Sequence, residues 1–427
     1  MKKTSLFVST SLLFVMSHGY AKHNYSSDSQ YFFGDWGGKR TEMVNKGVKF
    51  DTSLFSDTAY LVSGGRKSGS SPESSAHLNI GAEFDMQKIA GWQGVKIRAQ
   101  ASARQGQSMG VRDLQDPSAP QLSNSQVTFG RGNQQSRLSE LSIEKQFGNT
   151  GFNIKVGRLS MGADFDVMSC NFQNSSFCGA QMGKWQNNIW MNTPVAEWGG
   201  RIKYEINSEL TAQVGVYQFN PDDGKSNAEG LGWSLSVEHA DGITIPIEVI
   251  WHPQAFLNGL PGSYRFGLLY NTANDPNNQK NISTGMPESH TTGEWIAIEQ
   301  QLTSKGSGKQ GLEMFENFTW HDQTTNKIDH TEQIGFEYIG LGEKHPDDMV
   351  GLAVNRIHLN KNFVHAQVAS GKHQFDANAE YNLELNYNYH LTKWLLLRPD
   401  LQYIVHPGSS HIVSNAFVLG LSTKVTF

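Results

Sequence analysis

The sequence lacks any run of about 20 apolar residues beyond its first twenty positions, and a membrane-spanning helix needs a run of that length. This excludes a helical membrane protein. Charge is also scarce, because only 18% of the residues are charged, against a typical ~25%. The 35 Lys and Arg do not outnumber the 40 Asp and Glu, which argues against a nucleic-acid partner. Aromatic residues are plentiful, and ten Trp, 23 Phe and 13 Tyr exclude a disordered chain.

The first 21 residues have the pattern of a secretory signal peptide. A short basic start precedes the apolar stretch Leu6–Met16, and small residues at Gly19 and Ala21 fit cleavage after Ala21. A membrane anchor would need a longer span. Export implies an oxidising compartment, so the only two cysteines, Cys170 and Cys178, are predicted to form a local disulfide. Half of a metal site is the rival interpretation, but no second cysteine pair or nearby histidine completes it.

Residues 48–427 alternate between apolar and polar side chains over segments of about ten residues. This period of two indicates strands with one apolar and one polar face, long enough to cross a bilayer at a tilt. The last thirteen residues show the alternation best, segments 381–391 and 395–405 share it, and the same rule appears in further segments such as Leu231–Val237. Short and long connections alternate, as in an outer-membrane barrel. A soluble sandwich of this length would need several cores, and no linker divides the chain.

The strand count by sequence is seventeen, whereas a barrel with both ends in the periplasm needs an even number. The two segments whose strand assignment is in doubt are Glu294–Leu302 and Gly311–His321. In them, Glu299 and Glu316 occupy alternate positions that otherwise hold apolar residues. The fold class predicted is therefore an all-β, transmembrane, antiparallel β-barrel with a short N-terminal helix.

The alternate strand positions that hold polar side chains include charged residues of both signs. These residues are Lys96, Arg98, Arg104, Arg201, Lys203, Arg265 and Arg398, with Glu83, Asp85, Glu140, Glu144, Glu205, Glu238, Glu248, Glu384 and Asp400. Facing lipid near the midplane, a charged side chain costs about 2–4 kcal/mol, so this parity indicates an aqueous lumen. Such a lumen suits a neutral polyhydroxylated solute, whereas an ion-selective pore would show one dominant sign. Salt bridges that only hold the wall are an equal alternative for any single residue.

Catalytic signatures are not found in the sequence. It contains no G-x-S-x-G, H-E-x-x-H, P-loop or paired C-x-x-C pattern. Glu140 and Glu144 lie about 13 Å apart on one strand, too far for a retaining carboxylate pair. His358, His365 and His373 fit loop and strand surface better than metal ligation. We therefore expect no enzyme activity, no cofactor and no metal site.

Four separated segments carry distinctive motifs. Residues 33–40 read FGDWGGKR, residues 156–165 read VGRLSMGADF, the two-cysteine loop follows, and residues 398–408 read RPDLQYIVHPG. Together these segments resemble the carbohydrate-selective porins of the OprB type, with Ser409 in place of that family's second glycine. The resemblance runs from about Phe33 to Phe427.

This resemblance implies a 16-stranded barrel in the Gram-negative outer membrane that passes sugars, especially glucose-like monosaccharides, by facilitated diffusion. It implies outer-membrane lipid and the assembly machinery as partners, with Phe427 part of the insertion signal. Residues 22–47 are expected to form a periplasmic segment with a helix over Trp36–Lys46, in which Asp35 is the N-cap and Gly47 the stop. We expect this segment to pack at the periplasmic mouth. Oligomeric state is not readable, because a subunit interface and a lipid face share the period of two.

The long disulfide-closed loop suits an inward fold that narrows the pore. We predict Arg98, Arg104, Glu140 and Arg158 as constriction residues. In a regular strand the alternation would place Arg158 on the lipid face, so a β-bulge is needed to turn its side chain into the lumen. Phe172, Phe177 and Trp185 could stack on sugar faces or pack the loop down, and packing is preferred for Phe172.

Two alternatives to a sugar channel stay open at this point. The first is a porin for polyols or small organic acids, and the mixed-sign lumen disfavours acids only slightly. The second, from a different class, is a secreted β-rich carbohydrate-binding protein or glycosidase.

Overall fold

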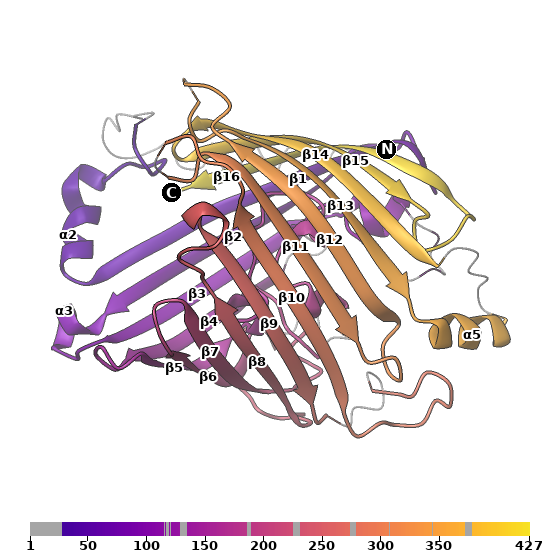
Figure 1. Ribbon diagram of the computed structural model, residues 1–427, viewed down its shortest axis with the longest axis horizontal. Coiled ribbons are helices and arrows are strands. Elements are labelled where there is room, and N and C mark those ends of the chain that lie inside the picture. Colours follow the sequence, from indigo (N-terminus) through magenta and orange to yellow (C-terminus); the bar gives the residue numbers. More distant parts are fainter. Residues whose placement is uncertain are drawn as a thin grey trace.

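Sixteen strands make up a closed antiparallel barrel in the part of the chain that the structure describes (Figure 1). We describe residues 28–114, 116, 119, 121–128, 135–185, 189–224, 231–273, 279–306, 308–343, 345–371 and 378–427 of a computed structural model. The predicted signal peptide lies outside these residues. Among them, no helix is long and apolar enough to span a membrane.

Each strand pairs with its neighbours in sequence, and β1 closes the ring against β16. The strands are β1 Val48–Gly65, β2 Glu73–Asp85, β3 Val95–Gly106, β4 Gln135–Gln146, β5 Phe152–Leu159, β6 Glu197–Glu205, β7 Leu210–Gln218, β8 Ile243–Trp251, β9 Gly262–Asn271, β10 Thr291–Gln301, β11 Gly311–His321, β12 Ile328–Ile339, β13 Met349–Leu359, β14 Ala379–Thr392, β15 Leu395–Val405 and β16 Ser414–Thr426. Closure leaves no free sheet edge.

The predicted parity is confirmed on β14 and β16. Leu383, Leu385 and Leu419 are more than 40% exposed on the outer face, whereas Asn382 and Glu384 are buried inside. An apolar outer face of this kind suits contact with lipid tails, and the inner Asn382 and Glu384 side chains have hydrogen-bond partners within the barrel.

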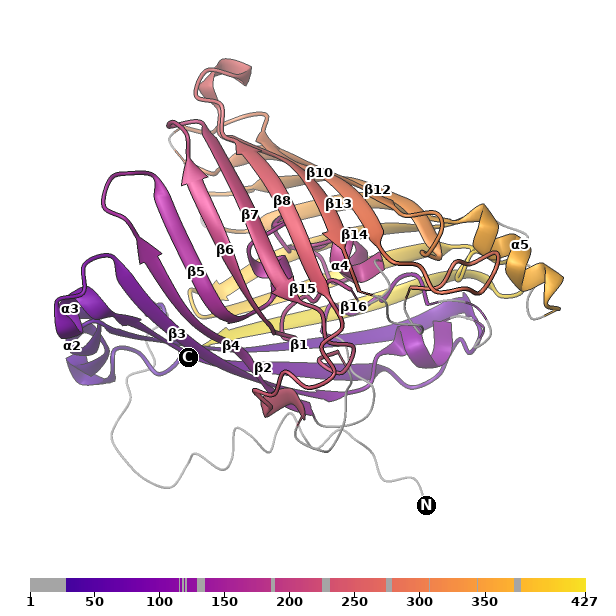
Figure 2. The ribbon, with the colours of Figure 1, turned by 90° about the horizontal axis from the view of Figure 1, so that it is seen from below.

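In the described part of the chain, four α-helices flank or enter the barrel, namely α2 Lys39–Asn45, α3 Met86–Ala90, α4 Met182–Trp185 and α5 Lys361–Ala369. Figures 1 and 2 show α2 and α3 at the end of the barrel that holds the C-terminus, and α5 at the opposite end. The short turns lie at the α2 end, which is the periplasmic end in outer-membrane barrels.

The helix predicted over Trp36–Lys46 is shorter than expected. A 3-10 turn over Trp36–Gly38 breaks at Gly37, and α2 begins only at Lys39, with Gly38 as its N-cap. The Asp35 carboxylate nevertheless accepts hydrogen bonds from the backbone N–H and the hydroxyl of Thr41. Two consecutive glycines with positive φ explain the break, because their backbone leaves the helical region.

Leu231–Val237 is not a strand, which corrects the count of seventeen. This segment begins with a 3-10 turn and lies in the connection between β7 and β8, which pair directly with each other. Trp233 is 48% exposed, and its indole N–H donates to Ser136 Oγ. The alternating apolar and polar residues of this segment therefore belong to a loop that pairs with no strand in the described part of the chain.

The two doubtful stretches are both strands, β10 and β11. The alternation of β10 did not distinguish its two faces, because its lumen face carries the apolar residues Trp295 and Ala297, which pack against an inserted loop. Glu299 shares that lumen face and accepts a hydrogen bond from Ser169 N at 2.8 Å. Glu316 lies on the outer face of β11, opposite Ile298 and Ile334 of the adjacent strands.

Candidate functional site: a lumen narrowed by inserted loops

The described residues of the connection between β5 and β6, 160–185 and 189–196, fold into the barrel, and we call them the eyelet loop. The disulfide Cys170–Cys178 closes its tip, with 4.3 Å between the Cα atoms. Phe172 of the tip packs within 5.5 Å of Phe315, measured between ring centroids, on the inner face of β11. The tip therefore crosses the lumen to the strands on the far side.

Polar side chains of β14 and β15 hold the tip by its backbone. Both oxygens of the fully buried Glu384 carboxylate accept backbone N–H groups, one from Gln173 and one from Asn174, each at 2.7 Å. The Arg398 guanidinium donates to Phe172 O at 3.1 Å, and the Asn386 side chain donates to Asn171 O. Charge-assisted bonds to backbone groups of this kind add to the apolar contacts of Phe172 in fixing the position of the tip.

The beginning of the eyelet loop is fastened to the wall by Asp166. Its backbone N–H donates to Glu248 Oε1 at 2.9 Å, and its carboxylate accepts from Met182 N and from the Asn317 amide. Arg265 pairs with Glu248 at 2.9 Å. Burial raises the pKa of the Asp166 carboxyl to about 7.

A second segment, residues 121–128, also enters the barrel. The Gln126 side chain donates to Asp57 O at 2.9 Å, and Thr128 N donates to the Asp57 carboxylate at 2.7 Å. Asn124 O accepts from Ser175 N of the eyelet loop at 2.8 Å. The two inserted segments therefore brace each other.

On β1 and β3 to β6, side chains of alternating charge form a continuous chain that reaches the eyelet loop. Successive contacts of 3.0 to 3.4 Å join Asp51, Arg98, Glu140, Lys155, Asp164, Arg201 and Glu144. Asp51 and Arg98 keep 38% and 31% of their side chains exposed, whereas those of Lys155 and Arg201 are largely enclosed. Glu144, at the other end of the chain, is 32% exposed. The Asp51–Arg98 end, which we call the exposed end of the charge chain, offers donors and acceptors of both signs to a solute.

A cavity of about 300 Å³ lies between the loop tip and the short-turn end of the barrel. Its lining includes Asn171, Asn388, Arg398 and Lys424, together with the ring of Phe55. The Lys424 ammonium lies 5.2 Å from the centroid of that ring. An aromatic face beside amide, guanidinium and ammonium donors is a suitable surface for a sugar ring and its hydroxyl groups.

Comparison with known proteins agrees with this architecture. Residues 70–427 match the model of the carbohydrate-selective porin, OprB family. Porin B of Pseudomonas aeruginosa is 35% identical over 96% of this chain and 94% of its own length, and the putative porin QuiX of Acinetobacter baylyi is 35% identical over 94% of each chain.

Solved structures give the same result. The high-pH structure of Pseudomonas putida OprB has a TM-score of 0.88 at 36% identity, covering 94% of this chain and all of that one. Its low-pH structure has a TM-score of 0.61 at 27% identity, over the same shares of the two chains. The DcaP channel of Acinetobacter baumannii, at 10% identity, 89% and 97% coverage and a TM-score of 0.51, shares the fold alone.

The chain belongs to the OprB family of carbohydrate-selective porins. It is an outer-membrane channel for carbohydrates and not an enzyme. The family and the closed barrel decide against a secreted binding protein or glycosidase.

The structure brings together only two of the four residues that the sequence proposed for the constriction of this porin. Arg98 and Glu140 contact each other at 3.1 Å in the charge chain. Arg104 lies on the same lumen face of β3, but about 20 Å further along at ~3.3 Å per residue. There its guanidinium lies 3.4 Å from His77 Nδ1.

Arg158 lies apart from the other three. The ladders of β5 with β4 and β6 run without a register shift through this residue, so the bulge that would turn it into the lumen does not form. Its guanidinium donates to Ser234 O and Ala196 O and pairs with Asp223 at 3.2 Å. These contacts fasten the connections that precede β6 and β8.

The aromatic residues of the eyelet loop pack the porin's interior. Phe172, Phe177 and Trp185 are 1%, 0% and 7% exposed. Packing, preferred for Phe172, therefore holds for all three, and none offers a free ring face. Sequence reasoning missed Phe55 as a lumen aromatic, although it shares parity with Asp51 and Asp57, which could have revealed it.

Proposed function

We propose that this porin passes glucose-like monosaccharides by facilitated diffusion past the exposed end of the charge chain and the cavity beside Phe55. The observation that carries the proposal is the pairing of Arg98 with both Asp51 and Glu140 at a partly exposed position. A neutral solute with many hydroxyl groups can exchange hydrogen bonds with donors and acceptors of both signs, whereas a net-charged solute meets repulsion from one of them.

Arg98 and Glu140 are then the constriction residues on the wall, and Arg398 and Asn388 line the cavity on the proposed path. Arg104 is assigned a bracing role instead, because its guanidinium contacts the buried His77. Phe427 as an insertion signal for the assembly machinery stays a prediction of the family resemblance.

Liposome swelling with a graded solute series tests this proposal. We expect faster swelling in glucose than in a disaccharide, a polyol such as sorbitol or the acid gluconate. Arg98→Gln should reduce glucose entry about three- to tenfold, since a hydrogen bond to a charged group contributes ~1.5–3 kcal/mol and part of it is replaced by water.

Lys96→Gln is the matched control, because Lys96 lies two residues away on the same face and pairs with Glu83 near the short-turn end. Equal rates for all solutes would reduce the protein to a general diffusion pore. Faster entry of sorbitol or gluconate than of glucose would favour the alternative solutes.

A further inference from the structure

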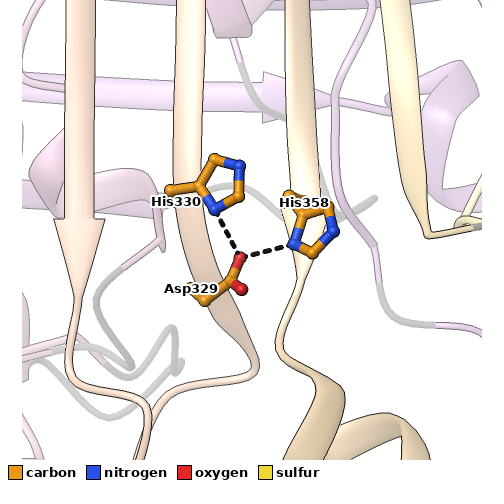
Figure 3. A group of neighbouring side chains, drawn as sticks. All are labelled: Asp329, His330 and His358. Atoms are coloured by element: carbon orange, nitrogen blue, oxygen red, sulfur yellow. Dashed lines mark hydrogen bonds and ion pairs between the residues drawn. The ribbon is translucent and has the colours of Figure 1, made fainter.

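Asp329, His330 and His358 form a cluster at the long-loop end of β12 and β13, away from the lumen (Figure 3). His330 and His358 are directly opposite each other in the antiparallel ladder. They share the outer face with Phe336 and Val354, which are 39% and 42% exposed. The cluster therefore takes no part in the sugar path described above.

A β-bulge brings Asp329 into this cluster. The register shifts between Ile328 and His330, so two residues of β12 occupy one step of the ladder there. In a regular strand the side chains of neighbouring residues point to opposite faces, and a bulge re-aims one of them. The Asp329 carboxylate consequently reaches both imidazole rings, as Figure 3 shows.

The ligand atoms of the cluster are already close together. Nδ1 of His330 and Nδ1 of His358 lie 2.8 and 2.7 Å from the same oxygen of Asp329. The two rings are nearly parallel, with centroids 4.5 Å apart, and the three ligand atoms lie within 4.8 Å of one another. Two imidazole nitrogens and one carboxylate oxygen form a donor set that suits Zn²⁺ and similar divalent ions.

We propose that Asp329, His330 and His358 form a binding site for a divalent transition-metal ion such as Zn²⁺. An ion held at ~2.0–2.2 Å from each ligand would replace the two hydrogen bonds that now join the imidazoles to the carboxylate. The His330 side chain is 28% exposed, so the fourth position opens to water and gives the ion a way in. Asp329 and His358, at 11% and 9% exposed, form the enclosed side of the site.

The surrounding charges favour a cation. Arg356 donates to His330 Nε2 at 3.3 Å and pairs with Glu332 at 3.0 Å. When His330 binds metal through Nδ1, its proton moves to Nε2, and Arg356 keeps Glu332 as its partner. With neutral imidazoles, Asp329, Glu332 and Arg356 carry a net charge of −1, which attracts a divalent ion.

Such an ion would clamp two adjacent strands at the rim from which the α5 connection leaves. Because metal binds the folded arrangement of ligands and not the dispersed one, added Zn²⁺ should also raise the thermal unfolding midpoint.

Isothermal titration of the full chain in detergent, without a histidine tag and after chelator treatment, tests the proposal. We expect one equivalent of Zn²⁺ to bind at pH 7.5, and no binding of Ca²⁺, which prefers six to eight oxygen ligands. Asp329→Asn and His358→Asn should each weaken Zn²⁺ binding at least tenfold. Arg356→Gln should bind Zn²⁺ as tightly as the parent or tighter, because it removes a neighbouring positive charge.

His365→Asn is the matched control, because His365 is exposed on α5 near the same rim. Equal Zn²⁺ binding by His358→Asn and His365→Asn, or no binding by the parent chain, overturns the proposal. X-ray absorption at the zinc edge of the parent chain gives a second test that needs no variant. Two imidazole ligands support the site, and fewer than two overturn it.

Discussion

Asp166 illustrates how a single buried residue links the eyelet loop to pH. Burial is the main cause that raises the pKa of its carboxyl to about 7, and nearby Glu248 raises it further. In the unfolded chain this group titrates near its ordinary value of about 3.9. Between these values the folded state keeps a proton that the unfolded state has lost, so folding stability falls as pH rises through this window.

We therefore predict that the unfolding midpoint of the porin decreases between pH 4 and pH 7, with the full penalty present above pH 7. A shift of about three pKa units corresponds to at most about 4 kcal/mol. Asp166→Asn should flatten this dependence, because an amide has no proton to lose. Thermal unfolding followed from pH 4 to 8 checks this, and an equally steep dependence in the variant would contradict it.

At the scale of elements, glycine on the lumen face lets the eyelet loop lie against the wall. A Cβ at Gly267 would overlap the Trp295 indole, and one at Gly351 would lie 2.9 Å from the Phe172 ring. Both glycines lie within strands, where glycine ordinarily weakens the ladder and marks a close approach. Part of the glycine content of the chain is thus explained by loop packing as well as by turns.

The tip of the eyelet loop depends on Glu384, which accepts two backbone N–H groups. Glu384→Gln removes one acceptor and places an amide N–H against a backbone N–H, at a cost of ~1–3 kcal/mol. We expect the tip to loosen, so that single-channel conductance rises and disaccharide entry at least doubles.

The control for this variant is Glu83→Gln, which changes an inward glutamate that pairs with Lys96 near the short-turn end. Planar-bilayer recordings and liposome swelling measure both variants. Unchanged conductance in Glu384→Gln would show that other contacts hold the tip without it.

At the scale of the whole molecule, the N-terminal segment is fastened where the barrel closes. Arg40 is buried, with its guanidinium 3.8 Å from the Tyr31 ring centroid and 4.3 Å from that of Trp36. It donates to Phe427 O at 2.9 Å. Phe32 packs against Phe427 and against Trp394 of the last short turn. These contacts join the described part of this segment, residues 28–47, to the short-turn end of the barrel, and packing of residues 22–47 at the periplasmic mouth stays a prediction.

Arg40→Ala should lower the free energy of unfolding by about 1–3 kcal/mol, since it removes two cation–π contacts and a charge-assisted hydrogen bond. Conductance should stay unchanged, because Arg40 lies outside the lumen site. Urea unfolding in detergent, with exposed Lys39→Gln as control, measures the first effect. A loss of stability equal to that of the control would contradict this role.

The sequence predicts a strand where the two faces of that strand contact different surroundings. On β14 and β16 one face meets lipid and the other meets polar groups, so the period of two identifies both. On β10 this signal fails, since Trp295 and Ala297 face an inserted loop instead of water. Parity also predicted that Arg98 and Glu140 share the lumen face, where they contact each other, and their role at the constriction stays a proposal.

The sequence by itself determined the class of the protein: a barrel without membrane helices, a lumen of mixed charge and a cysteine-closed loop. These properties are local, because strand periodicity and composition follow from what each face must dissolve in. Only the tertiary structure decided that Arg158 holds loops instead of lining the pore, that Glu384 anchors the tip, and that a bulge joins Asp329 to two histidines. Such contacts depend on register and on where a loop returns to the wall, and residues 28 to 211 positions apart in the chain meet there.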